Sequence, residues 1–413
     1  MNESGARSQP PGRYAKRAWQ SDVIVDLIKH YGFPYIALNP GASYRGLHDS
    51  LVNYGGNDPP LLLCQHEKIA VQIAHGYAKA TGKPMMAIVH DVVGMLHATM
   101  GIYYAYLDRC PVFVVGATGP MDESRRRPFI DWIHSANVNG EQLRHYVKWD
   151  YQPASIEGVP DSFARAYAAM MTEPQGPIYM CYDAWLQEQP LVRDVALPNA
   201  AHSKVPAAMV ADPAALAAVA ERLMGANYPV LMAEYVARGA SGFDHLVALA
   251  ETAGAAVFDV HARLNFPNRH PLNLSCHKEI FRDADLIVSL DARDWEKSTH
   301  FVERTERRVA PYYPPALRDD RDRLRRNQLE QMVDGLHAHA GVQPARARRH
   351  RDCDPSADAS VPGTDRQRAV ACRAHQGARQ GGRCQARRLV CVLERTGQGG
   401  LGRRADHAAA ARQ

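Results

Sequence analysis

The chain has 413 residues, enough for two or three domains, and its 46% hydrophobic and 23% charged residues are typical of a globular protein. No run of 18 or more apolar residues occurs, which excludes a membrane-spanning helix, and the polar, basic stretch from Met1 to Arg17 is not the pattern of a secretory signal. Eight cysteines without a Cys-x-x-Cys pair indicate neither a zinc site nor a disulfide framework. We therefore expect a cytoplasmic protein.

The net charge of +5 is unevenly distributed along the chain. Residues 343–413 hold fifteen arginines against six acidic residues, a net of +9, so the other residues carry about −4. All aromatic residues lie at or before Tyr313, and the last lysine is Lys297. A domain needs large apolar side chains to offset its chain entropy, so residues 314–413 do not have the composition of a packed domain.

Three explanations of this C-terminal segment were considered. A basic tail that binds nucleic acid would explain the arginines, and a disordered linker would explain the missing aromatic residues. Translation in a shifted frame explains both, because the enriched Arg, Ala, Gly and Pro have GC-rich codons and the missing Lys, Ile, Phe and Tyr have AT-rich ones. We expect an aberrant, frameshifted tail and no nucleic-acid partner.

The predicted elements alternate between helix and strand, which is the pattern of parallel sheets covered on both faces. In chain order the first group is helix 19–30, strand 35–38, helix 47–54, strand 61–64, helix 68–81, strand 85–90, helix 96–107 and strands 112–116 and 178–181. A stretch rich in Pro and Ala follows from Gln187 to Val205. The second group is helix 213–223, strand 230–233, helix 243–252 and strands 256–260 and 285–290.

This pattern predicts an α/β protein with two doubly wound domains whose sheets are mainly parallel. The expected bounds are a polar arm at 1–18, an N-terminal domain at 19–187, a linker at 188–205, a central domain at 206–313 and a poorly structured tail at 314–413.

The most informative stretch begins at Glu67, which follows a predicted buried strand and opens a predicted helix. Ligands bind at that edge of parallel α/β sheets. Taken alone, Glu67 is better explained as a residue that stabilises the helix N-terminus by about 0.3–1 kcal/mol. Ala70, Ala74 and Ala78 form a stripe suited to close packing, either inside the domain or against another subunit.

The sequence from His66 to Pro84, HEKIAVQIAHGYAKATGKP, resembles the pyrimidine-binding domain of thiamine-diphosphate-dependent enzymes of the acetolactate synthase, benzoylformate decarboxylase and pyruvate decarboxylase type. The segment Asn39–Ser43 (NPGAS) resembles the first loop of this family, and His90 with Gly94 falls at its loop after the third strand. The resemblance is clear over the predicted N-terminal domain and fainter over the central one.

This resemblance implies thiamine diphosphate as the cofactor, bound through Glu67, Pro40, Gly41 and Gly94. Glu67 would hydrogen-bond N1′ of the aminopyrimidine so that the 4′-amino group can deprotonate the thiazolium ring. That exchange calls for a carboxyl whose pKa is raised by partial burial. His90 is the second catalytic candidate, because some family members use a histidine there on the substrate, and a structural role in the loop remains open.

Other positions mark departures from the family. His97 stands where the family often has Asn, and Arg125–Arg127 could hold an anionic substrate or form a solvated charge run. Asp131-Trp132 with His134 indicates a subgroup with a substrate of its own. Where some relatives have a glycine cluster that binds flavin, this chain has the bulky, acidic pair Glu234-Tyr235, so bound FAD is not expected.

The family's third domain carries a Gly-Asp-Gly…Asn motif that holds Mg²⁺ and the diphosphate, and Gly-Asp-Gly occurs nowhere in these 413 residues. In the family the cofactor lies between this domain of one subunit and the pyrimidine domain of another. We therefore expect no metal ligands here, and a truncated or inactive homo-oligomeric relative of enzymes that decarboxylate or ligate 2-oxo acids. The alternative is a non-catalytic or split subunit that needs a separate diphosphate-domain chain.

Overall fold

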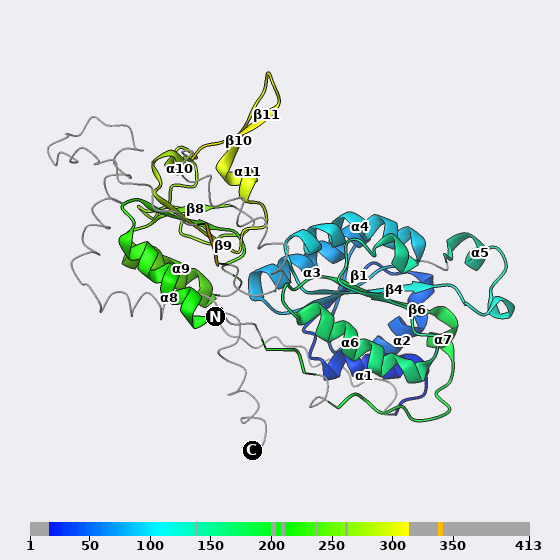
Figure 1. The fold of residues 1–413 in the computed structure, drawn as a ribbon. Coiled ribbons are helices and arrows are strands. Elements are labelled where there is room, and N and C mark those ends of the chain that lie inside the picture. Colours follow the sequence, from blue (N-terminus) through cyan, green and yellow to red (C-terminus); the bar gives the residue numbers. More distant parts are fainter. Residues whose placement is uncertain are drawn as a thin grey trace, which may run out of the picture. The chain divides into compact units, whose positions relative to one another are not determined.

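The computed structural model describes residues 16–136, 139–199, 204–207, 211–236, 238, 240–260 and 263–313, and the backbone of 338–341. These residues form two compact units that divide between Ala207 and Ala208 (Figure 1). Residues 1–15 and nearly all of 314–413 lie outside the described residues. The expectations for the polar arm and for the tail therefore remain predictions.

The first unit is built on a six-stranded sheet in the order β2-β1-β3-β4-β6-β5, in which all neighbours run parallel. The strands are β1 (Ile36–Leu38), β2 (Leu61–Leu63), β3 (Met85–Ile88), β4 (Val112–Thr118), β5 (Asp150–Tyr151) and β6 (Ile178–Asp183). Every residue of β1, β3, β4 and β6 is buried, as expected for strands with helices on both faces.

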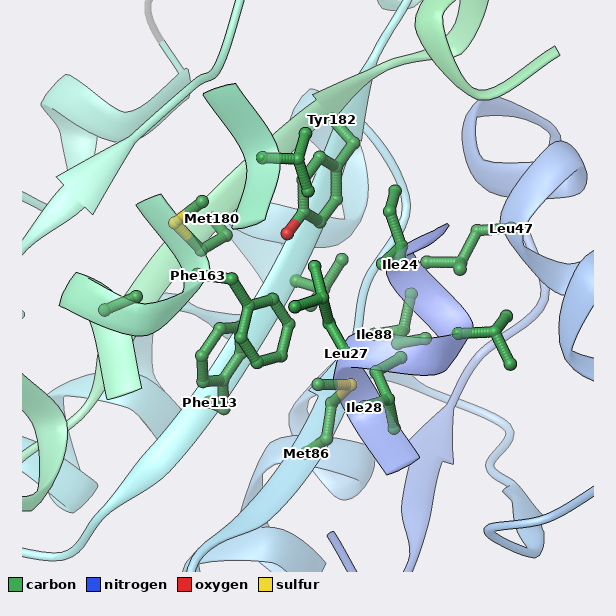
Figure 2. Close-up of a cluster of buried hydrophobic side chains, with 14 of the residues drawn as sticks. Ile24, Leu27, Ile28, Leu47, Met86, Ile88, Phe113, Phe163, Met180 and Tyr182 are labelled. Carbon is green, nitrogen blue, oxygen red and sulfur yellow. The ribbon is translucent and has the colours of Figure 1, made fainter. Parts of the chain in front are cut away.

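Helices cover both faces of this sheet (Figure 1). The helices α3 (Glu67–Thr81) and α4 (Val92–Leu107) lie on one face, and α1 (Gln20–His30), α2 (Arg45–Asn53), α6 (Val159–Met171) and α7 (Ala184–Glu188) lie on the other. On the second face Leu27, Phe113 and Phe163 belong to one buried hydrophobic cluster (Figure 2), and the rings of the two phenylalanines stack with centroids 4.5 Å apart. Burying each such side chain contributes about 1.5–3 kcal/mol to the stability of the fold, so the sheet holds the loops at its edge in fixed positions.

The sequence analysis missed α6 and the short strand β5. The signals for α6 were present, because Pro160 stands in its first turn and Phe163, Tyr167 and Met170 recur at helical spacing on its buried face. Short helices were missed as well, including α5 (Ile130–His134), which has a single buried residue, Asp131.

The second unit has a sheet in the order β12-β9-β7-β8. The strands β7 (Pro229–Ala233), β8 (Ala256–Asp259) and β9 (Leu286–Leu290) are parallel, and β12 (Ala338–Gly341) runs antiparallel to β9. One face packs against α8 (Pro213–Gly225) and α9 (Ala240–Ala253), and the other against α10 (Ile280–Asp283).

The second unit also contains elements that the sequence analysis did not anticipate. The short helix α11 (Trp295–Thr299) leads into a hairpin of β10 (His300–Glu303) and β11 (Arg308–Pro311). The main sheets of both units are nevertheless mainly parallel with helices on their faces, which confirms the predicted α/β fold class. Among the described residues, no helix has the length and apolarity needed to cross a bilayer.

Candidate functional site

Three loops of the first unit meet because β2, β1 and β3 are neighbours in the sheet and end at the same edge. The loop after β1 contains Asn39 and Gly41, Glu67 follows β2, and His90 follows β3. The structure therefore places Glu67, His90, Gly41 and Gly94 together, while Pro40 in the same loop is exposed.

Glu67 is the first residue of α3 and is only 5% exposed. The preceding residue, His66, caps the helix by accepting a hydrogen bond from the backbone N–H of Lys68 at Nδ1, 3.1 Å away. On the facing helix α4, Nδ1 of His97 lies 3.2 Å from Oε2 of Glu67. The carboxyl group is thus held between the two helices, close to one imidazole from each.

The pKa of Glu67 differs from the sequence-based expectation. Burial raises it, but hydrogen bonds from the backbone N–H of Glu67, from the Asn39 side chain and from His97 outweigh burial. The pKa therefore lies below its ordinary value, and the carboxylate is ionised at neutral pH. The prediction of a raised pKa was wrong because it considered burial without these donors.

The loop after β1 is fixed by its own hydroxyl groups. The Tyr44 hydroxyl donates to the carbonyl of Asn39, and burial, aided by the charge of Glu67, raises the pKa of that hydroxyl well above its ordinary value. Oγ of Ser43 accepts a hydrogen bond from the backbone N–H of Asp91 at 3.1 Å and lies 2.7 Å from Nδ1 of His90. The loop therefore sets the orientation of His90.

His90 is half-buried, and its ring meets that of His134 edge-on at 5.5 Å. Burial lowers its pKa, the nearby His134 lowers it further, and Glu67 acts in the opposite direction. The imidazole is therefore neutral at neutral pH. With Nδ1 engaged by Ser43, Nε2 is the nitrogen left to act on a bound molecule.

Gly41 and Gly94 allow the backbone to approach these side chains closely. A Cβ at Gly41 would lie 2.6 Å from Cγ of His90, and one at Gly94 would lie 2.9 Å from both Oε1 of Glu67 and Cβ of His90. The sequence analysis placed Gly94 in a loop, but it lies in the first turn of α4, because that helix begins at Val92 rather than near residue 96. The two glycines therefore let the loop after β1 and the first turn of α4 lie directly against Glu67 and His90.

Asp91 is a site residue that the sequence analysis did not identify. Its carboxylate is 1% exposed and accepts hydrogen bonds from Val92 N–H at 2.6 Å, Gly119 N–H at 3.1 Å and Asn139 Nδ2 at 3.1 Å. Burial raises its pKa, although these donors oppose the rise. Asp91 therefore anchors the start of α4, which carries Gly94 and His97. Its position at a helix start was the available signal.

Gln187 is the last residue of the predicted N-terminal domain, at the start of the Pro- and Ala-rich stretch, and its side chain is almost fully buried at 1% exposure. Its amide NH₂ donates to the carbonyls of Ser43 at 3.2 Å and Tyr182 at 3.0 Å, and its amide oxygen accepts from Leu47 N–H at 3.1 Å. Gln187 thus fastens the loop that orients His90. Nothing in the local sequence marks this role.

The arginine run lies near this edge of the sheet but is engaged by the protein itself. Arg125 stacks over the ring of Trp185 at 4.6 Å, and Arg127 forms a bidentate pair with the buried Asp131, with bonds of 2.7 and 3.1 Å. These contacts give Arg125 and Arg127 structural roles on the segment that leads into α5. The segment that they hold in place carries Trp132, whose side chain is 81% exposed.

The alanine stripe packs inside the first unit. Ala70, Ala74 and Ala78 are fully or almost fully buried in the core between α3, α4 and the sheet. The outer surfaces of the same helices instead expose apolar residues at helical spacing: Ile69, Ile73, Leu96, Met100 and Tyr104. We call these five residues the α3–α4 face.

In the second unit the side chain of Glu234 points into the protein rather than toward solvent. It is 1% exposed and accepts the backbone N–H of Arg293 at 2.5 Å, while Asn265 donates to the Glu234 carbonyl at 2.9 Å. Asn265 also binds Oδ1 of Asp259 at 2.8 Å. Side chains thus occupy the carboxyl end of β7, and the expectation that no flavin binds there stays a prediction.

Comparison with known proteins connects this geometry to a family. Residues 19–139 match the model of the thiamine pyrophosphate enzyme N-terminal TPP-binding domain. The benzoylformate decarboxylase of Pseudomonas aeruginosa is 29% identical over 267 residues, covering 60% of this chain and 48% of that protein. The acetolactate synthase large subunit of Lactococcus lactis is 30% identical over 159 residues, covering 38% of this chain and 26% of that protein.

A solved structure shares the fold. The benzoylformate decarboxylase of Polynucleobacter necessarius superposes with a TM-score of 0.56 at 26% identity, covering 67% of this chain and 51% of that one. The chain therefore spans about half the length of the benzoylformate decarboxylases it matches. The share of this chain covered is larger than the first unit, so the similarity extends into the second.

Proposed function

Since the chain belongs to the thiamine-diphosphate-dependent enzymes and is related to decarboxylases and acetolactate synthases, we propose that it binds this cofactor for decarboxylation or carboligation of a 2-oxo acid. The observation that carries the proposal is the environment of Glu67. Its buried carboxylate stands at the start of α3, and the Cβ-free side of Gly94 faces it. In this proposal an aminopyrimidine ring binds at Glu67, because its ring nitrogen pairs with a carboxylate.

In this proposal Glu67 exchanges a proton with the ring nitrogen, and Asn39 and His97 hold the carboxylate in position. The lowered pKa of Glu67 favours the carboxylate in the free site, which is the form that accepts a proton. Ser43 orients His90 so that the neutral Nε2 can contact a substrate. When bound, the cofactor supplies the electron sink that allows the carboxylate of a 2-oxo acid to leave as carbon dioxide.

We propose further that the predicted N-terminal domain, residues 19–187, is the pyrimidine-binding half of a divided site. Gly-Asp-Gly does not occur in these 413 residues, and no other ligands for Mg²⁺ and a diphosphate were identified from sequence. A frameshift within 314–343 would account for this in a cytoplasmic enzyme. A split enzyme with a separate diphosphate-domain chain is the second candidate, and the same missing motif favours it.

A second copy of the chain is the proposed partner of the α3–α4 face. Its residues are apolar and exposed on neighbouring helices, whereas a solvent-facing helix surface is usually polar. Glu67 and His97 lie at the starts of these helices, so a subunit covering the face would also shield the site from water.

Two measurements test the proposed function. Calorimetry of the 413-residue chain with thiamine diphosphate and Mg²⁺ should show no tight binding, because charge-assisted contacts to metal and phosphate are among the strongest a site can make. A version with the reading frame restored beyond 313 should bind the cofactor and decarboxylate 2-oxo acids. In it, Glu67→Gln should lower the rate by about 10²–10⁴-fold, since the amide keeps the shape but cannot exchange a proton.

Glu157→Gln is the matched control, because Glu157 is exposed in a short helix on another part of the first unit. It should leave the rate unchanged. Micromolar binding of the cofactor by the unaltered chain would contradict the half-site proposal. Full activity of Glu67→Gln in the restored enzyme would remove Glu67 from the mechanism. The DNA downstream, read in all three frames, separates a frameshift from a split enzyme.

A further inference from the structure

Three potential metal ligands gather at the starts of α3 and α4. The ligand atoms of His66, Glu67 and His97 all lie within 4.8 Å of one another. The two imidazole rings stack, with centroids 4.7 Å apart and planes inclined by 25°. This set of two imidazoles and one carboxylate is the chemistry that zinc and its neighbours in the transition series prefer, and it differs from the all-oxygen shell of Mg²⁺.

The spacing of one pair already suits coordination. Nδ1 of His97 and Oε2 of Glu67 are 3.2 Å apart. In a tetrahedral site with bonds of about 2.0–2.1 Å, adjacent ligand atoms are about 3.3 Å apart. A metal ion can therefore replace the proton that these two groups share. The third ligand, His66, is one residue from Glu67, and one of the two stacked imidazole rings must turn so that both can point a nitrogen at the same ion.

Of the three ligands, His97 is accessible to solvent and Glu67 is held in place by the protein. The His97 side chain is half exposed, which gives an ion access from solvent and lets the ring turn toward it. The Glu67 carboxylate is buried and held by Asn39, which keeps one ligand in a single orientation. We propose that His66, Glu67 and His97 form a binding site for Zn²⁺ or a similar divalent transition-metal ion.

Metal binding has a defined cost at His66. Its Nδ1 now accepts a hydrogen bond from Lys68 N–H, so the ring proton is on Nε2. An ion at either ring nitrogen removes this helix cap, which is worth about 1 kcal/mol. Bound metal should therefore loosen the first turn of α3.

This site also bears on the proposed function, on which the present step rests. Glu67 cannot hold a metal ion and pair with an aminopyrimidine nitrogen at the same time. The ion and the cofactor ring therefore compete, and Zn²⁺ acts as an inhibitor of cofactor binding. Because protons compete with the metal for the histidines, the inhibition weakens as the pH falls.

The test uses the 413-residue chain titrated with Co²⁺ followed by visible absorption, and with Zn²⁺ followed by calorimetry. We expect the d–d absorption bands of Co²⁺ bound by nitrogen and oxygen ligands. Zn²⁺ should displace the Co²⁺ and abolish these bands. His97→Ala and His66→Asn should each lower the affinity at least about tenfold, since changes even outside the ligand set cost 10–100-fold. Asparagine at position 66 retains a helix cap, so a loss there reports on the imidazole. His145→Ala, at an exposed histidine outside the group, should have no effect.

Equal affinity in the wild type and in both ligand variants would overturn the proposal, and so would a thiolate-to-cobalt charge-transfer band, which would place the ion on cysteine. Competition is measured with the free aminopyrimidine fragment of the cofactor by ligand-observed NMR. Its displacement by Zn²⁺ supports the shared site. Metal binding with no detectable fragment binding would count against the proposed function and leave the metal site intact.

Discussion

Adding a methyl group at Gly94 tests whether this glycine is required by close contacts or is an ordinary helix residue. The Cβ of Gly94→Ala would lie 2.9 Å from Oε1 of Glu67 and 2.9 Å from Cβ of His90. Real Cβ atoms do not approach so closely, so both contacts must lengthen. The Glu67 carboxylate is the end of a flexible side chain, while Cβ of His90 is fixed by the backbone. We expect the carboxylate to move away from its present partners and the backbone at Gly94 or His90 to shift.

The magnitude follows from two opposing effects. Overpacking by one methyl group costs about 1–3 kcal/mol, and replacing glycine by alanine in a helix returns at most about 1 kcal/mol, less in a first turn. The free energy of unfolding should therefore fall by about 1–2 kcal/mol. The same substitution at Gly101, where a Cβ would meet Cγ1 of Val71 at 3.2 Å, should be close to neutral. At Gly76 no atom lies within 4 Å, so alanine should stabilise by about 1 kcal/mol.

The assay is urea unfolding followed by tryptophan fluorescence. Four of the five tryptophans belong to the first unit, so the signal reports mainly on the unit that contains these glycines. The expected order of stability, from highest to lowest, is Gly76→Ala, Gly101→Ala and Gly94→Ala, because the three sites differ in free space within the same helix pair. If Gly94→Ala stabilises as much as Gly76→Ala, the close packing around Glu67 is not real.

Two further predictions concern association and pH. Met100→Lys should shift the sedimentation coefficient of the chain toward that of a monomer, because it places a charge in the proposed subunit contact, and a wild-type chain that is already monomeric at micromolar concentration would refute the contact. Burial raises the pKa of Asp108, but hydrogen bonds from His75 at 2.9 Å and Lys79 at 2.6 Å outweigh burial, so its folded pKa lies below 3.8. Its stabilisation is complete above that value and is lost as the pH falls through the folded pKa. Asp108→Asn should therefore lower the free energy of unfolding by about 1–2 kcal/mol at neutral pH and by less in acid. As the control, Asp161→Asn removes an exposed ion pair and should change the free energy of unfolding by at most about 0.5 kcal/mol. An Asp108→Asn effect that does not diminish in acid would argue against this ion pair.

The parts of the fold that the sequence predicted are those governed by local pattern. Buried strands alternate with helices in both units, and α3 ends at Thr81, as the sequence predicted, where Gly82 follows with a φ of 68°. These features depend on a few adjacent residues. The same local pattern placed Glu67 at a strand end and a helix start, whereas its cofactor role was inferred from the resemblance of residues 66–84 to a family.

What the sequence could not provide depends on contacts between distant residues. The pKa of Glu67 is set by His97 and Asn39, about thirty residues away on either side, and the buried amide of Gln187 reaches Ser43 across 144 positions. The alanine stripe was compatible with two kinds of packing, and only the fold shows that it lies in the core. Neither a pairing between loops nor the choice between two packing faces is encoded in a local pattern.

The first unit ends beside its own beginning. Trp19 forms an isolated bridge with Pro190, and Arg17 binds the carbonyl of Val195 at 2.6 Å and the carboxylate of Asp194 at 2.9 Å. Because the first and last segments of this unit lie side by side, other sequence can be joined to both of its ends without pulling the strands of the sheet apart. The site loop, however, is secured only when Gln187 is in place. During synthesis, the loop that orients His90 would therefore gain the hydrogen bonds of Gln187 only when α7 (Ala184–Glu188) has left the ribosome, although Ser43 and His90 emerge much earlier.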